Sequence, residues 1–365
     1  MKKGRIKPFF QALLHLLMAI GLLAARQPAV FQKIPAPTGS ILSDPAALVR
    51  QIDEVLDYYR DFGSADPLLT KNPPCLPAGV SLATIQTTLV FIRDTVKEDL
   101  AKNNPIRLQD PAFWARHFDV FRWRPPLEKS DRASSIRVTR YAVFFVPGRF
   151  KKDETYRYAL YRVPDDEQGL GVAEARQRKE TLARFRYTRQ MVMAGAYDRG
   201  GAKPLVWLTK DGLQKALMQG TIAVRLPDHS LTYFNVDRDN GQPFNPALKN
   251  PDEQKRYWYF AEVPAAKGYG PDVASMVDIY PGVALAGDVE NLGLGLVIGL
   301  RHPVPRSGEW HIHLGILADT GGAFSANLSQ LDYFLGTFSS AAAFKKASGK
   351  FPEYVEVFLF IKKPI

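Results

Sequence analysis

The spacing of apolar residues changes near Ser135, and this change restricts the fold of the chain more than any other feature. Upstream, apolar residues recur at helical intervals, whereas downstream short segments alternate apolar and polar residues, as half-buried strands do. Turns rich in Gly, Pro, Asn or Asp separate the expected strands, which are residues 135–146, 155–163, 204–208, 221–226, 256–263, 295–300 and 355–361. Short helices followed by many strands predict an α+β fold that is mainly β and built as barrels or sandwiches.

The upstream helices have clear end signals. The first expected helix begins at Ser43 or Asp44, with Pro45 in its first turn, and ends at Gly63. One face of this helix is apolar and contains Leu48, Val49, Ile52, Leu56 and Tyr59. A second helix is expected from about Ser81 to Lys102, and a third begins at Asp110 and Pro111.

The N-terminus has the layout of an export signal. A basic segment, MKKGRIK, precedes an apolar run, Pro8–Ala25, that is interrupted only by Gln11 and His15. The run is nearly long enough to remain in a bilayer, so residues 1–26 are expected to be either a signal peptide or a membrane anchor. Residues 27–42 contain three prolines and no periodicity, which predicts a linker. The expected location is the periplasm or cell envelope.

Composition excludes several classes of site. A single cysteine, Cys75, rules out an internal disulfide framework and a cysteine-rich metal site. The net charge of +11 suits an anionic polymer or a membrane surface, or serves solubility alone. Nucleic acid is not an expected partner, because export separates the chain from it. His311 and His313 share one face of a strand, but no third ligand has a metal-site spacing, so no metal or cofactor is expected.

Two aspartates, Asp319 and Asp332, lie in an otherwise apolar, glycine-punctuated stretch, residues 316–336. The triplet Asp319-Thr320-Gly321 is the unit found in aspartic proteases, which need two carboxylates sharing one proton. The chain has no second such triplet, so a protease would require a homodimer with one aspartate from each subunit. Alternatively, Asp319 simply accepts backbone N–H groups in a turn.

Asp332 is harder to explain as a surface acid. Leu331 precedes it and Tyr333 follows it, so burial is expected to favour its neutral form and to raise its pKa. A carboxyl group with a raised pKa is suited to act as a general acid at neutral pH.

A series of short motifs follows in a characteristic order. The motifs are VFFVP (143–147), YRYALYRVPDD (156–166), YTRQMVMAGAYDRGGAKPLVWL (187–208), QGTIAVRLPD (219–228), DNGQPF (239–244), PGVALAGD (281–288), DTGGAF (319–324) and LDYFLG (331–336). Each motif alone is weak. Their order and spacing, from about Val138 to Lys363, resemble those of the membrane-bound lytic murein transglycosylase A family, which ends in a three-aspartate domain.

The resemblance implies a fold, a substrate and an activity. The fold is a double-psi β-barrel formed with the N-terminal helices by residues 43–164 and 263–365, with a second β domain, residues 165–262, inserted. The groove between the domains would hold a peptidoglycan glycan strand, bound by a monomer. The implied reaction cleaves the bond between N-acetylmuramic acid and N-acetylglucosamine and forms a 1,6-anhydro sugar.

The resemblance also implies site residues. The family's catalytic acid corresponds to Asp332, with Asp319 and Asp288 as its companions. A nearby anionic Asp319 is expected to help apolar neighbours raise the pKa of Asp332. Residues expected to contact the sugar through the matched motifs are Gln219, Gly220, Thr221, Asn240 and Gly241. Aromatic residues that would stack on sugar rings, or alternatively pack in the core, are Trp207, Trp258 and Phe244.

The chain departs from the family pattern at several positions. Ile222 stands where the Q-G-S-G motif has its second glycine, and Val283-Ala284 replace the Arg-Ser of a G-R-S motif. Met191 replaces an acidic residue, and two extra residues lie between Asp319 and Asp332. These departures leave two alternatives open: a non-catalytic glycan-binding protein on the same fold, or a hydrolase that cleaves another β-1,4-glycan with water.

Overall fold

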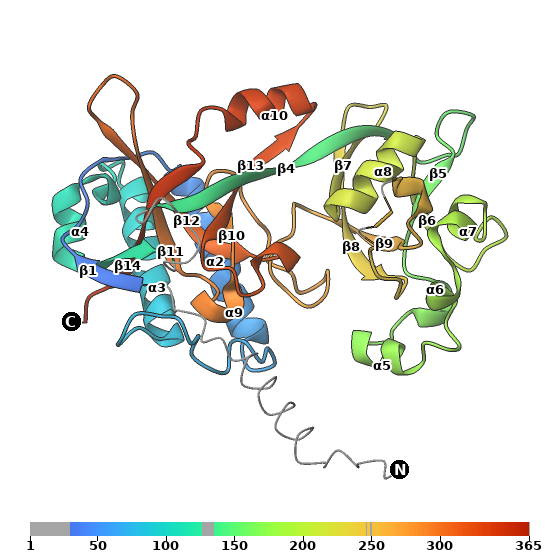
Figure 1. The fold of residues 1–365 in the computed structure, drawn as a ribbon, viewed down its shortest axis with the longest axis horizontal. Coiled ribbons are helices and arrows are strands. Elements are labelled where there is room, and N and C mark those ends of the chain that lie inside the picture. The colour runs from blue at the N-terminus through green and yellow to red at the C-terminus, as the bar shows by residue number, and fades with distance from the viewer. Residues whose placement is uncertain (1–29, 126–134, 246, 249, 365) are drawn as a thin grey trace, which may run out of the picture.

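The computed structural model describes residues 30–125, 135–245, 247–248 and 250–364 (Figure 1). The expected signal peptide or anchor, residues 1–26, lies outside these residues. Within the described ranges, no helix combines the length and the apolar character needed to cross a bilayer.

A closed six-stranded barrel forms the first lobe. Its strands are β4 (Ile136–Arg149), β10 (Ala284–Ala286), β11 (Val297–Pro303), β12 (Trp310–Asp319), β13 (Gln330–Phe338) and β14 (Tyr354–Lys362). The order is β14-β11-β12-β10-β13-β4, and pairing of β4 with β14 closes the ring. The pairs β10–β12 and β4–β13 are parallel, whereas the other neighbours are antiparallel. This mainly β barrel confirms the predicted fold class.

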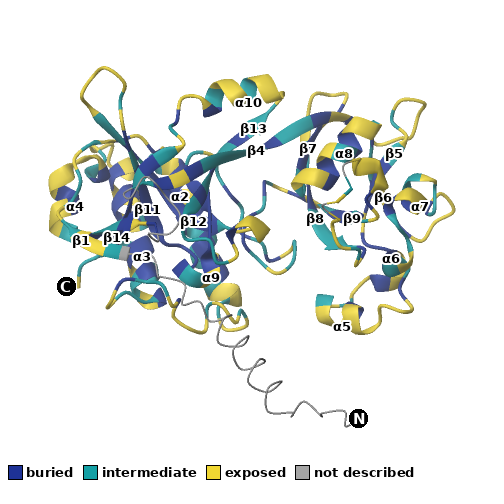
Figure 2. Ribbon diagram, in the orientation of Figure 1, coloured by how far each residue is buried: buried dark blue, intermediate teal, exposed yellow. Residues whose placement is uncertain are grey.

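The N-terminal helices pack beside the barrel and confirm the helical predictions (Figure 1). α2 spans Pro45–Phe62, with Asp44 accepting from the backbone N–H of Ala47 at its start and Gly63 at its end. α3 spans Leu82–Ala101 and is capped by Ser81, and α4 spans Pro111–His117. Their inward faces are buried with the barrel strands (Figure 2).

The segment predicted as a linker is instead partly strand. β1 (Val30–Ile34) pairs antiparallel with β3 (Phe118–Arg124), and β2 (Ser40–Ile41) pairs parallel with β12. The prolines between β1 and β2 interrupt the alternation of apolar and polar residues that indicates a strand. The pairing of these two short strands could therefore not be predicted from the sequence.

The second lobe has its own hydrophobic core. Its strands are β5 (Tyr158–Tyr161), β6 (Pro204–Leu208), β7 (Thr221–Arg225), β8 (Leu231–Asp239) and β9 (Trp258–Val263). β4 continues out of the barrel into this lobe, where it pairs with β6 and β7 (Figure 1). The core of the lobe already includes Val146 and Leu160, so it begins before residue 165, the predicted start of the inserted domain.

Shorter helices complete both lobes. In the second lobe they are η3 (Asp165–Glu167), α5 (Val172–Gln177), α6 (Ala183–Arg186), α7 (Arg189–Met193), α8 (Lys210–Gln219) and η4 (Pro251–Glu253). In the first lobe they are η1 (Arg107–Gln109), α9 (Val289–Leu292), η5 (Gly322–Phe324) and α10 (Ala341–Ser348).

Candidate active site

A cleft of about 500 Å³ lies between the two lobes. The barrel contributes Tyr141, Ala286, Asp319, Asp332 and Phe334 to its walls. The second lobe contributes Gln219, Gly220, Thr221, Asn235, Asp237, Arg238, Asp239 and Trp258. Both acids of the 316–336 stretch therefore face one cavity, together with the polar end of α8 and the start of β7.

The barrel topology places the two acids on either side of one residue. Ala286 of β10 pairs in parallel with Asp319 at the end of β12, and antiparallel with Asp332 near the start of β13. Neighbouring strands lie about 4.8 Å apart, so the Cα atoms of the two aspartates are separated by roughly 10 Å. The short strand β10 thus brings together acids that are distant from it in sequence.

The Asp332 carboxyl accepts hydrogen bonds through only one of its two oxygens, Oδ1, among the described residues. The Thr139 hydroxyl and the Gln330 side-chain amide both donate to Oδ1, the amide over 3.1 Å. Oδ2 has no hydrogen-bond partner among the described residues. Burial raises the pKa of Asp332, whereas Gln330 and the charge of Arg137 oppose the rise. The rise was expected, but the anticipated contribution of Asp319 is absent from its causes.

Asp319, the second acid of the cleft, also has a raised pKa. Burial raises its pKa to about 6, and the charge of Asp332 adds to the rise. Two donors oppose it: the Tyr141 hydroxyl, 2.8 Å from Oδ2, and the backbone N–H of Thr320, 2.7 Å from Oδ1. The turn interaction expected for Asp319 is present, and the same carboxyl also faces the cleft.

Replacing Tyr141 with phenylalanine is expected to raise the pKa of Asp319 above its value of about 6. The variant keeps the aromatic ring but removes a hydrogen bond that favours the ionised carboxylate. Titration of the aspartate carboxyl carbons by NMR measures the shift. Tyr233→Phe is the matched control, because the Tyr233 hydroxyl interacts with Thr337 rather than with Asp319. An unchanged or lowered pKa in Tyr141→Phe would show that the tyrosine hydroxyl does not stabilise the anion.

Asp288, the third expected acid, does not line the cleft. It is 2% exposed and caps α9, where its carboxylate accepts from the backbone N–H of Asn291 and, over 2.8 Å, from the Asn291 side-chain amide. These contacts assign it a structural role at a helix N-terminus, in place of the expected role beside the catalytic acid.

Only some of the residues expected to bind sugar line the cleft. Gln219, Gly220 and Thr221 line the cleft, and so does Trp258. Gln219 is exposed and accepts from the backbone N–H of Phe144, while the Thr221 hydroxyl bonds to Asn235. Gly220 ends α8 with φ of 79°, a left-handed conformation that favours glycine.

Asn240, Gly241 and Trp207 are not among the residues that line the cleft. Asn240 is fully buried and bonds through its amide to the carbonyls of Tyr187 and Lys255 and to the N–H of Tyr257, so it holds the second lobe together. Gly241 follows it in a turn with φ of 72°. Trp207 lines a separate cavity of about 220 Å³, so its expected stacking role in the groove is not supported.

Some cleft residues were not anticipated. Tyr141 lies on a correctly predicted strand, but alternation alone does not give the register that points its hydroxyl at Asp319. Asp237, Arg238 and Asp239 form a charged run at the end of β8, a segment that carried no strand prediction. The run of three consecutive charged residues was the one feature of the sequence that could have marked this segment as part of a site.

Of the two histidines singled out in the sequence, His313 contacts a third histidine, His302. His313 stacks on His302, with 3.3 Å between their Nε2 atoms, and burial lowers the pKa of His313 to about 4. The described part of the chain contains no group of three or more side chains arranged to hold a metal ion.

Comparison with known proteins identifies the architecture. Residues 137–250 match the family model described as the MltA-specific insert domain. Escherichia coli MltA with bound chitohexaose matches over 93% of this chain and 96% of its own, with 14% identity and a TM-score of 0.59. The second lobe thus matches the MltA-specific insert domain, and the chain as a whole has the fold of MltA.

Other solved structures share the fold. MltA from Neisseria gonorrhoeae covers 94% of this chain and 95% of its own length, with 16% identity and a TM-score of 0.58. A membrane-bound lytic murein transglycosylase from Agrobacterium tumefaciens covers 88% and 93%, with 20% identity and a TM-score of 0.55. No curated protein sequence matches the chain. The chain thus shares the MltA fold with these proteins at a sequence identity of 20% or less.

The structure accounts for two of the departures from the family motifs. Ile222 is fully buried in the core of the second lobe, and Val283 and Ala284 are fully buried in the barrel core. Apolar residues at these positions pack in the interior and do not obstruct the cleft. Met191 is exposed on α7, and nothing in the structure explains its substitution.

Proposed function

We propose that this protein is a lytic transglycosylase that cleaves peptidoglycan between N-acetylmuramic acid and N-acetylglucosamine. The observation that carries the proposal is the arrangement of Asp332: its Oδ1 is held by Thr139 and Gln330, its Oδ2 is left free of described partners, and its pKa is raised by burial in an interlobe cleft. A carboxyl group of this kind is suited to keep a proton and donate it to a bound substrate.

The reaction requires only one carboxyl group. Protonated Asp332 donates to the glycosidic oxygen as an oxocarbenium-like state develops at the anomeric carbon. The resulting carboxylate then accepts a proton from the 6-hydroxyl of the muramic acid, whose oxygen attacks the anomeric carbon and closes the 1,6-anhydro ring. Because the attacking hydroxyl belongs to the same sugar, its effective molarity is high and no activated water is needed.

The cleft has the features of a glycan site. It is bordered by both lobes and presents an aromatic ring, Trp258, beside hydrogen-bonding groups of Gln219 and Thr221. Sugars are bound in proteins by such combinations of flat apolar faces and polar groups. The E. coli MltA structure with bound chitohexaose supports a β-1,4-linked amino-sugar chain as the ligand of this fold.

Trp258→Ala is expected to weaken binding of chitohexaose about tenfold, as loss of a central aromatic anchor does. Trp258 lines the cleft, and the Arg256 guanidinium lies 4.1 Å from the centre of its ring. Calorimetric titration measures the affinity. Trp207→Ala removes the same side chain from the separate cavity and is expected to leave the affinity unchanged. Weakening by Trp207→Ala alone would exclude the interlobe cleft as the glycan site.

Hydrolysis by water is the second candidate, and Asp319 is the observation that favours it. This acid shares the cleft with Asp332 and has a pKa of about 6, so it is available as a base near neutral pH. Glycoside hydrolases use such a second carboxylate to activate water or to form a covalent intermediate.

Digestion of purified sacculi followed by mass analysis distinguishes these reactions. Anhydro-muropeptides are expected, because the 6-hydroxyl attack releases no reducing end. Reducing ends would indicate the hydrolase, and binding to sacculi without turnover would indicate a glycan-binding protein. We propose the cell envelope as the site of action, since the N-terminal sequence has the layout of an export signal or anchor.

A further inference from the structure

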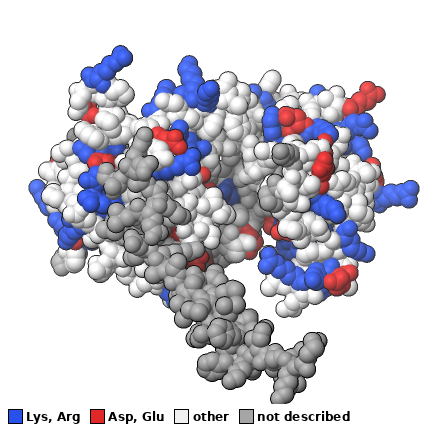
Figure 3. All heavy atoms as spheres, viewed as in Figure 1, with Lys and Arg blue, Asp and Glu red and all other residues white. Residues whose placement is uncertain are grey.

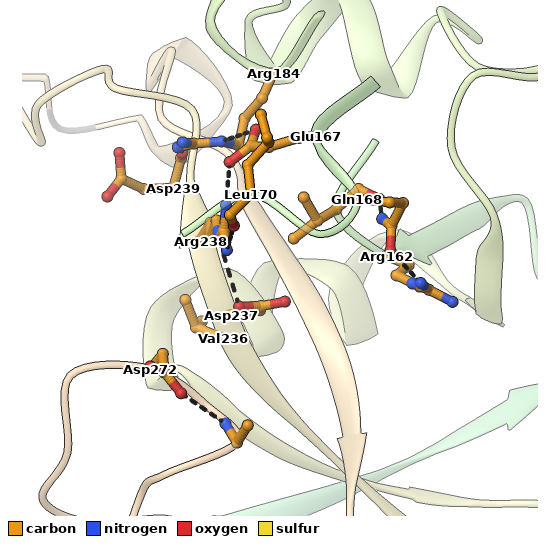
Figure 4. Close-up of polar contacts among 12 residues, drawn as sticks. Arg162, Glu167, Gln168, Leu170, Arg184, Val236, Asp237, Arg238, Asp239 and Asp272 are labelled. Atoms are coloured by element: carbon orange, nitrogen blue, oxygen red, sulfur yellow. Dashed lines mark hydrogen bonds and ion pairs between the residues drawn. The ribbon is translucent and has the colours of Figure 1, made fainter. Parts of the chain in front are cut away.

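Asp237 stands on the second-lobe wall of the cleft, near the end of β8. Its neighbour Arg238 is fixed by a buried acid: Arg238 Nη1 donates to Glu167 Oε1 over 2.5 Å, and Nη2 donates to the Leu170 carbonyl over 2.7 Å. Asp237 lies on the other side of Arg238 from Glu167 (Figure 4), with 3.8 Å between Arg238 Nε and Asp237 Oδ1. Arg238 is thereby anchored to Glu167 and Leu170, and Asp237 retains only a long ion pair with it.

The Asp237 carboxylate has unused capacity to accept hydrogen bonds. No described residue donates a hydrogen bond to it, although it is partly buried and burial raises its pKa. An ionised carboxylate offers several acceptor positions, and leaving them unfilled in a partly buried wall is unfavourable. A ligand in the cleft that carries a donor would fill them.

The charge of the cleft restricts the kind of donor. Its walls carry four carboxylates, Asp237, Asp239, Asp319 and Asp332, and two cations, Arg238 and Lys267. Both cations are paired with acids that do not line the cleft: Arg238 with Glu167, and Lys267 with Asp278 over 2.5 Å. Even with Asp332 protonated, as the proposed function requires, three acids remain and both lining cations are already paired. The lining of the cleft is therefore acidic, although the chain has a net charge of +11 and lysine and arginine are spread over both lobes (Figure 3).

We propose that Asp237 is a specificity-determining residue that selects glycans carrying an unacetylated, protonated amino group on the sugar beside the second lobe. This inference rests on the proposed function, because it assigns a substrate class to the same cleft. A sugar ammonium group supplies three donors and a positive charge, whereas an acetamido group supplies one donor and no charge. A charge-assisted hydrogen bond between ammonium and carboxylate is roughly twice as strong as a neutral one.

Binding in an inactive background tests the proposal. The affinities of chitohexaose and of the fully de-N-acetylated hexamer are compared by calorimetry in Asp332→Asn, at a slightly acidic pH that keeps the amines protonated. The de-N-acetylated hexamer is expected to bind about tenfold more tightly. Adding Asp237→Asn is expected to remove most of this preference.

Asp211→Asn is the matched control, because Asp211 is an exposed acid of α8 in the same lobe, with a side chain that is 73% exposed. Asp211→Asn removes one negative charge, as Asp237→Asn does. It is expected to leave the preference for the de-N-acetylated hexamer unchanged. Thermal melting of each variant confirms that it is folded. Equal binding of the two hexamers, a preference that survives Asp237→Asn, or loss of it in Asp211→Asn would each overturn the proposal.

The outcome is separable from that of the proposed function. The binding preference does not depend on which product is formed. If wild-type protein releases no anhydro product but Asp237 still governs the preference, the proposed reaction is wrong and the specificity assignment stands. If neither hexamer binds, the cleft is not a glycan site and the specificity assignment is overturned.

Discussion

Asp332→Asn is expected to lower the rate of peptidoglycan cleavage by about 10²- to 10⁴-fold, the usual contribution of a positioned general acid. Asparagine fills the same space and can accept the hydrogen bond from Thr139 through its amide oxygen, but it cannot deliver a proton to the glycosidic oxygen. Release of anhydro-muropeptides from sacculi measures the rate. Binding of chitohexaose is expected to persist, since the cleft keeps its shape.

Asp319→Asn is the informative comparison for this variant. In the single-acid mechanism the loss caused by Asp319→Asn is expected to be smaller, because Asp319 does not transfer the proton. If Asp332→Asn retains wild-type turnover while Asp319→Asn abolishes it, the roles assigned to the two acids are incorrect.

Glu167→Gln is expected to lower the free energy of unfolding of the second lobe by about 3–5 kcal/mol, the usual cost of removing one member of a buried ion network. The Glu167 side chain is 0% exposed and bridges two guanidinium groups, Arg184 and Arg238 (Figure 4). Glutamine leaves both cations in the interior without a compensating charge. Urea unfolding, followed by a probe in the second lobe, measures the change.

Glu174→Gln is the matched control for this prediction. Glu174 pairs with Arg178 on the surface of the same lobe, with a side chain that is 54% exposed, and its loss is expected to change the free energy of unfolding by less than about 1 kcal/mol. Equal effects of the two substitutions would show that the buried network does not stabilise the lobe. Because Glu167 anchors Arg238, its loss is also expected to disturb the cleft wall at Asp237.

Much of the secondary structure could be predicted from local signals. The limits of α2 follow from Asp44, Pro45 and Gly63, whose capping and turn preferences act within a few residues. The alternation of apolar and polar residues over 135–146 correctly predicted a strand, which is β4 in the structure. By contrast, β1, β2 and β10 are short or lie beside prolines and glycines, and they are strands only because distant partners pair with them.

The site was predictable only in part, for a related reason. Asp319 and Asp332 are unusual in their own sequence surroundings, so local reasoning singled them out. Asn240 and Asp288 are also polar, but both are buried. Asn240 forms hydrogen bonds inside the second lobe, and Asp288 caps α9. Trp207 and Trp258 cannot be told apart by composition, because the lobe packing decides which one faces the cleft.

Titration of the Asp332 carboxyl carbon by NMR, with Asp332→Asn to assign its signal, tests most directly whether this acid holds a proton for the substrate. The expected result is a pKa above the ordinary aspartate value of about 3.9, since burial disfavours the anion. A pKa at or below that value would contradict the mechanism, because the carboxyl would be ionised before the glycan arrived and would have no proton to donate.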